Sequence, residues 1–165
     1  MDICGMFLWI QRINAMKWLN LIEQDTDYVD DFVKEYNVYL EQAKKEVEIG
    51  HHIIAEARRL PQVVDTYFSR LQEIEAVHEV LDITLKKTRS KFHRHYLTNY
   101  QQKLVSRDVE RFVEGEPEYV DLMIKKNKVD MLRNKFASIT KGLEYKHFQI
   151  TNIVKLKAAG ADDFI

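Results

Sequence analysis

The chain has 165 residues, of which 45% are hydrophobic and 31% charged, with a net charge of −1, five glycines and two prolines. This length suffices for one domain with a sizeable core. Because glycine and proline are scarce, the composition disfavours a β-sheet protein and a disordered chain. The single cysteine, Cys4, excludes an internal disulfide framework and suits a cytoplasmic location, and the longest apolar run, residues 3–10, is too short to span a bilayer, so no membrane partner is expected.

Residues 1–24 are predicted to be a poorly defined N-terminal extension, and residues 25–97 a two-helix segment that forms a helical hairpin. The first helix is expected to begin near Asp25, because acidic residues suit a helix N-terminus, and to run to about Leu60. Pro61 disfavours a helical residue before it and fits the first position of a second helix. Apolar residues recur every seven positions in the first helix, at Val33, Leu40, Val47 and Ile54.

The second helix is expected to continue to about Tyr96, and it carries a similar seven-residue repeat. Its repeat positions are Val64, Leu71, His78, Leu85 and Phe92. Residues 98–116 are predicted to form an elbow that contains a short helix, capped by Ser106 and ended by Gly115.

Pro117 is expected to open the last long helix, residues 117–160, with residues 161–165 as an acidic tail. The heptad positions and their companions in this helix are the candidate oligomerisation residues: Leu122, Val129, Leu132, Phe136, Ile139, Leu143, Ile150 and Ile153. Sustained heptads in three long helices predict an all-α protein, a helical bundle or coiled coil shared between subunits of a homo-oligomer. A self-contained monomeric three-helix bundle is the alternative.

Positive charge is concentrated in the second half of the chain. Residues 1–82 carry sixteen acidic and eight basic residues, and residues 83–165 carry ten and seventeen. The densest stretch, residues 86–96, combines five Lys or Arg with aromatic residues and contains no acid. Single-stranded nucleic acid needs cations along its phosphates and rings on which its bases stack. The candidate nucleic-acid-binding residues are Lys86, Lys87, Arg89, Lys91, Arg94 and Tyr96. The alternative is a basic helix end that pairs with acids of a neighbouring helix.

A Glu-x-x-His spacing occurs three times, at Glu48/His51, Glu75/His78 and Glu144/His147. Di-metal helical bundles use two such pairs, so a di-metal oxidase is a remote alternative. Only His78 falls on a predicted heptad position, and we therefore expect neither a metal site nor a cofactor. Phosphate-binding glycine loops, nucleophile motifs and paired cysteines are missing from the sequence, which favours a non-enzymatic protein.

The segment from Lys141 to Ile153, with Gln149-Ile150-Thr151-Asn152-Ile153 at its end, resembles the C-terminal helix of the UvsY-type recombination mediators of tailed phages. The resemblance extends loosely to the basic segment from Leu85. It implies a helical homo-oligomer in the cytoplasm of a host cell that binds single-stranded DNA, helps to displace a single-strand binding protein and loads a recombinase, without catalysis of its own. It also implies that Lys86, Lys87 and Arg89 contact DNA. The main alternative is a coiled-coil assembly or scaffold protein whose partner is another protein.

Overall fold

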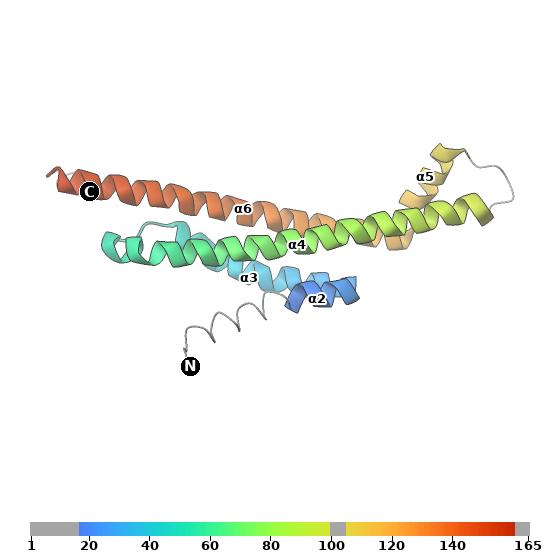
Figure 1. The fold of residues 1–165 in the computed structure, drawn as a ribbon, viewed down its shortest axis with the longest axis horizontal. Helices are drawn as coiled ribbons and strands as arrows, with labels where there is room; N and C mark the ends of the chain where they lie inside the picture. The colour runs from blue at the N-terminus through green and yellow to red at the C-terminus, as the bar shows by residue number, and fades with distance from the viewer. Residues whose placement is uncertain (1–16, 100–104, 161–165) are drawn as a thin grey trace. The chain divides into compact units, whose positions relative to one another are not determined.

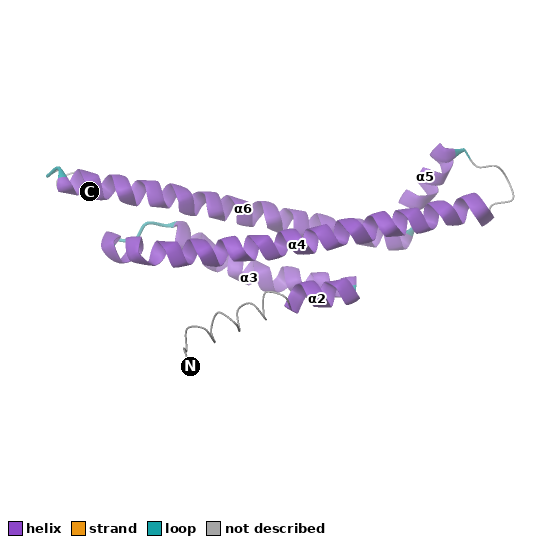
Figure 2. Cartoon of the chain, in the orientation of Figure 1, coloured by secondary structure: helices purple, strands orange, loops and turns teal. Residues whose placement is uncertain are grey.

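The computed structural model describes residues 17–99 and 105–160. The elements in chain order are α2 (Lys17–Gln24), the 3-10 turn η1 (Thr26–Tyr28), α3 (Val29–Val47), α4 (Ile53–Asn99), α5 (Ser106–Glu114) and α6 (Pro117–Ala158) (Figure 1). Figure 2 shows short loops between α3 and α4 and between α5 and α6, and the described residues contain no strand. The predicted all-α fold is therefore confirmed. Predictions for residues 1–16, 100–104 and 161–165 lie outside the described residues.

The chain divides into two compact units, to both of which α3, α4 and α6 contribute. Unit 1 comprises Met1–Val33 and Glu73–Met131, and unit 2 comprises Lys34–Gln72 and Leu132–Ile165. None of the helices described here is apolar over a length that could cross a membrane.

The core of unit 1 gathers side chains from α2, α3, α4, α5 and α6. Its most deeply buried members are Ile22, Val29, Phe32, Ile74, Val77, Leu81, Val109, Val113 and Val129. The ring of Trp18 packs edge-on against Phe32, with 5.8 Å between centroids. Asp25 caps η1, because its carboxylate accepts a hydrogen bond of 2.9 Å from the backbone N–H of Asp27. The acidic start predicted near this residue is thus confirmed, although a 3-10 turn precedes the α-helix.

Opposite charges from distant parts of the sequence pair within unit 1. The buried ammonium of Lys125 lies 2.5 Å from Asp27 and 2.7 Å from Asp121. Burial alone would lower the pKa of Lys125, but hydrogen bonds to the two carboxylates outweigh it and raise that pKa. Lys128 reaches Asp30 at 2.6 Å in the same way. Some acidic residues of the first half of the sequence therefore form ion pairs with basic residues of the second half.

The core of unit 2 is built around Phe136 of α6. Its ring lies 5.7 Å from that of Tyr36 on α3 and 6.4 Å from that of Tyr67 on α4. The other buried apolar members are Leu40, Ala43, Leu60, Val63, Leu132, Leu143 and Ile150. Three helices thus share one apolar interior, as the heptad pattern indicates.

The C-terminal heptad residues lie inside the chain rather than on its surface. The buried ones are Leu122, Val129, Leu132, Phe136, Leu143 and Ile150, while Ile139 and Ile153 are half-buried. The six buried side chains are therefore core residues of their own units within one copy of the chain, and a role of this helix between subunits stays a prediction.

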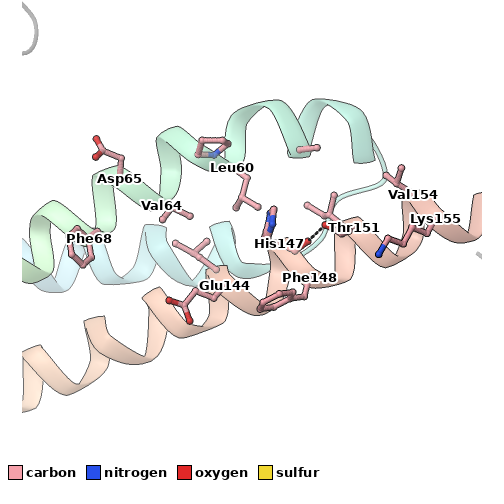
Figure 3. Close-up of a pocket in the computed structure, with 14 residues that line it drawn as sticks. Leu60, Val64, Asp65, Phe68, Glu144, His147, Phe148, Thr151, Val154 and Lys155 are labelled. Atoms are coloured by element: carbon pink, nitrogen blue, oxygen red, sulfur yellow. Dashed lines mark hydrogen bonds between the residues drawn. The ribbon is translucent and has the colours of Figure 1, made fainter.

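An apolar groove runs between α4 and α6 in unit 2 (Figure 3). Its volume is about 950 Å³. Most of its lining is apolar, and the residues that line it are Ala57, Leu60, Pro61, Val64, Asp65, Phe68, Leu143, Glu144, His147, Phe148, Ile150, Thr151, Val154 and Lys155. We call this feature the α4–α6 groove.

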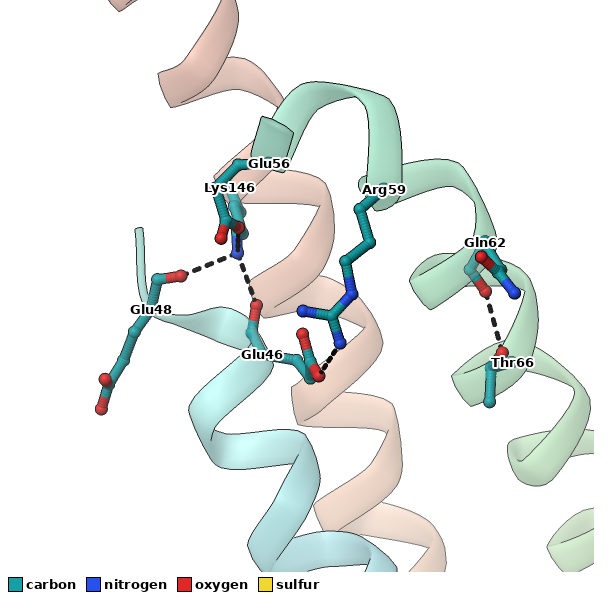
Figure 4. A network of polar contacts seen from close by, with 7 residues as sticks. All are labelled: Glu46, Glu48, Glu56, Arg59, Gln62, Thr66 and Lys146. Carbon is teal, nitrogen blue, oxygen red and sulfur yellow. Dashed lines mark hydrogen bonds and ion pairs between the residues drawn. The ribbon is translucent and has the colours of Figure 1, made fainter. Parts of the chain in front are cut away.

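The boundary between the first two long helices differs from the sequence prediction. Helix α3 ends at Val47 and α4 already begins at Ile53, so Pro61 lies inside α4 instead of opening it. The ammonium of Lys146 donates to the carbonyl oxygens of Glu46 and Glu48, at 2.8 and 2.7 Å (Figure 4). Carbonyls at the end of a helix lack the N–H groups that a continuing helix would offer them. The Lys146 ammonium is the hydrogen-bond donor for these two carbonyls, so α3 can end there.

This boundary also shifts the register of the first apolar seam. Ile54 was predicted to continue the seam of Val33, Leu40 and Val47, but it follows the break and is 70% exposed. A heptad count cannot pass through a break, because the chain between two helices resets the angular position of each side chain.

Candidate nucleic-acid interface

The basic stretch lies on the second half of α4, within unit 1. At about 100° per residue, Lys86, Lys87 and Arg94 fall on the side of the helix opposite the buried Leu81 and Leu85. All three basic residues are exposed. The sequence prediction of clustered cations is therefore matched by a shared outward face, which we call the α4 basic face.

Two further cations flank this face and reach carboxylates of other helices. A guanidinium nitrogen of Arg89 lies 3.4 Å from Glu110 of α5, and the ammonium of Lys91 lies 2.9 Å from Glu118 of α6. The four side chains are between 49% and 62% exposed. These two contacts match the alternative that the basic end of the helix pairs with acids of neighbouring helices, and the partners belong to α5 and α6. Exposed ion pairs of this kind contribute only about 0–1 kcal/mol.

Lys86 also has a carboxylate neighbour, on its own helix. Its ammonium lies 2.6 Å from Asp82, one turn earlier, and Lys126 approaches the same carboxylate at 3.1 Å. The hydrogen bonds from Lys86 and Lys126 lower the pKa of Asp82, and the bond to Asp82 raises the pKa of Lys86. Lys86 thus keeps its positive charge, and its side chain remains 75% exposed.

Tyr96 does not match the role predicted for it. Its ring stacks on Phe112 of α5, with 5.5 Å between centroids and 29° between planes, and its hydroxyl donates a hydrogen bond to Glu116. The ring of His95 also packs edge-on near it, with 5.7 Å between centroids. Tyr96 therefore ties α4 to α5, and it is not a free platform for a nucleic-acid base.

Two arginines of α5 extend the candidate interface, and they were missed in the sequence. Arg107 and Arg111 are spaced four residues apart and lie opposite Val109 and Val113, the two buried residues of this short helix. Both arginines are exposed. The available signal was the alternation of valines and arginines in the short helix that the sequence already predicts for this segment, since that spacing places the arginines opposite the valines.

The three Glu-x-x-His pairs do not form a common site. Glu75 is exposed, and Nε2 of His78 lies 3.0 Å from Asp130 without the geometry of a hydrogen bond. Glu144 and His147 line the α4–α6 groove. Among residues 17–99 and 105–160, no group of three or more His, Cys, Asp or Glu side chains could hold a metal ion.

Comparisons of the chain with protein-family models, curated protein sequences and solved structures found no match.

Proposed function

We propose that this protein binds single-stranded nucleic acid along the α4 basic face. The observation that supports the proposal best is that Lys86, Lys87 and Arg94 share one exposed side of a helix whose opposite side is buried. Such a row of cations follows a phosphate backbone without reading its sequence. Because the carboxylates near Arg89 and Lys91 are exposed, phosphate groups can replace them at little cost.

We further propose that the bound strand is handed to a recombinase in place of a single-strand binding protein. This part rests on the resemblance of Lys141–Ile153 to UvsY-type mediators. In this role the protein supplies a binding surface and no catalytic group. Arg107 and Arg111 of α5 would lengthen the cationic track beyond α4 and increase the number of phosphates contacted.

Fluorescence anisotropy with a labelled oligo(dT) tests the binding step. The charge reversal Lys86→Glu, Lys87→Glu, Arg94→Glu is expected to weaken binding at least about tenfold, because three phosphate contacts become repulsive. The matched control reverses three exposed lysines of unit 2, Lys45, Lys135 and Lys141, and so changes the net charge equally. Equal losses in both variants would mean that only the net charge matters. Circular dichroism would verify that both variants are folded.

The mediator step has its own assay. A recombinase filament should assemble sooner on strands that carry a single-strand binding protein when this protein is added, and the reversed variant should lose the effect. If the wild type binds strands but never shortens the lag of filament assembly, the mediator role is wrong and strand binding stands.

A second candidate is an assembly or scaffold protein whose partner is another protein. It is favoured by Val120, Ile124 and Met131 of α6, which are 40%, 50% and 62% exposed and lie on one stripe of the helix. An exposed apolar stripe at this spacing is typical of helices that dock on another helix. A protein with no affinity for oligo(dT) even at low salt would favour this candidate.

A further inference from the structure

The α4–α6 groove exposes large apolar side chains that the core of unit 2 does not use. Phe68 is 51% exposed, Phe148 is 62% exposed and Val154 is 47% exposed. On α6 the groove is lined by Glu144, His147, Phe148 and Thr151, whose spacing of three, four and seven residues defines one stripe of the helix. Two buried heptad residues, Leu143 and Ile150, line the groove beside this stripe. An apolar hollow of this size on a folded surface is typical of an interface.

Charged residues are divided between the two ends of the groove. Asp65 and Glu144 lie toward one end, and Lys155 lies at the other, as Figure 3 shows. Beyond Val154, Arg58 and Lys157 line an adjoining hollow of about 620 Å³. Eleven helical positions, about 16 Å, separate Glu144 from Lys155, so these two side chains cannot pair within one copy. The groove thus has an acidic end, an apolar middle and a basic end.

We propose that the groove is covered by the same groove of a second copy of this chain, turned end over end. A two-fold axis across the middle of the groove places the acidic end of each copy against the basic end of the other, and Phe148 against the apolar middle. An interface built by such an axis uses one patch twice, so the patch must be complementary to itself. The order of charges along the groove meets this requirement.

Two pairs of antiparallel helices then form a four-helix layer, in which each α4–α6 pair closes the groove of the other. Every groove residue belongs to unit 2, whereas the α4 basic face belongs to unit 1. The inference therefore goes beyond the proposed function and does not depend on nucleic-acid binding.

Sedimentation velocity of the full chain over a range of concentrations tests the interface. Phe148→Glu is expected to raise the dissociation constant of self-association at least about tenfold, because a charge replaces an aromatic ring in an apolar contact. Tyr145→Glu is the matched control, since Tyr145 lies on the same helix, is 64% exposed and does not line the groove. A wild type that stays monomeric at all concentrations overturns the proposal, as does a control that dissociates the assembly as strongly as Phe148→Glu.

A charge exchange tests the orientation of the two copies. Glu144→Lys and Lys155→Glu should each weaken association, because each brings like charges together across the interface. The double variant restores opposite charges and should recover most of the wild-type affinity. Since the two residues are too far apart to interact within one copy, additive losses in the double variant would overturn the end-over-end arrangement.

Discussion

The ammonium of Lys146 lies 2.5 Å from the carboxylate of Glu56, and the lysine side chain is only 3% exposed. The same ammonium also donates hydrogen bonds to the backbone carbonyls of Glu46 and Glu48 at the end of α3. One side chain of α6 therefore holds the end of α3 and the beginning of α4. In unit 2 it determines where the chain turns from one helix to the next.

Lys146→Met is expected to lower the free energy of unfolding by about 3 kcal/mol, because it leaves two carbonyls and a partly buried carboxylate without their cation. Lys141→Met, at an exposed position of the same helix, should change it by less than about 0.5 kcal/mol. Urea denaturation followed by circular dichroism measures both values. Equal stabilities of the two variants would show that the Lys146 contacts do not stabilise the turn.

Gly142 is needed where α3 and α6 approach each other. A Cβ at this position would lie 2.9 Å from one methyl carbon of Val47 and 3.2 Å from the other. Val47 is β-branched and ends α3, so it has few ways to move aside. Gly142→Ala should therefore destabilise the protein by about 1 kcal/mol, although alanine is intrinsically better in a helix by about the same amount.

The companion change Val47→Ala removes the obstacle. In that background Gly142→Ala is expected to stabilise the protein by about 0.5–1 kcal/mol, because only the gain in helix propensity remains. Thermal or urea unfolding of the four proteins completes the cycle. If Gly142→Ala has the same effect in both backgrounds, the two residues are not in steric conflict.

Asp82 makes stability depend on pH in the acidic range. Its pKa is lowered by hydrogen bonds from Lys86 and Lys126, so the folded protein binds fewer protons at this carboxyl than the unfolded chain, whose aspartates titrate near 3.9. The contribution of Asp82 to stability is complete above this value, and it is lost as the pH falls through the folded pKa. NMR titration of the carboxyl carbon should show the low pKa, and Lys126→Met should move it back toward 3.9. A wild-type Asp82 that titrates like a free aspartate contradicts this account.

The helical content could be predicted from the sequence because glycine and proline are rare. The buried positions of the last helix could be predicted because apolar residues repeat every seven positions along it. Pro117 opens α6 as predicted, but Pro61 proved a poor signal. A proline removes one N–H and does not by itself end a long helix that is held by packing on both sides. The real boundary depends on Lys146, about a hundred residues away in the sequence, and such a contact leaves no local signal.

The candidate interface was also only partly predictable. The clustering of Lys86, Lys87 and Arg94 follows from helix geometry, and the structure places them on one exposed side. Pattern alone could not reveal that Tyr96 stacks on Phe112, because that contact depends on how α5 folds back toward α4. The sequence also could not tell whether the heptad residues pack within one chain or between chains. A heptad pattern looks the same whether the neighbouring helix belongs to the same chain or to another.

The salt dependence of oligo(dT) affinity tests most directly whether the α4 basic face binds single strands. The logarithm of the binding constant should fall linearly with the logarithm of salt concentration, with about 0.7 units of slope for each phosphate contacted. Neutralising Lys86, Lys87 and Arg94 to Gln should reduce this slope by about 2, whereas neutralising Lys45, Lys135 and Lys141 should leave it unchanged. Identical slopes for the wild type and the first variant would contradict the account.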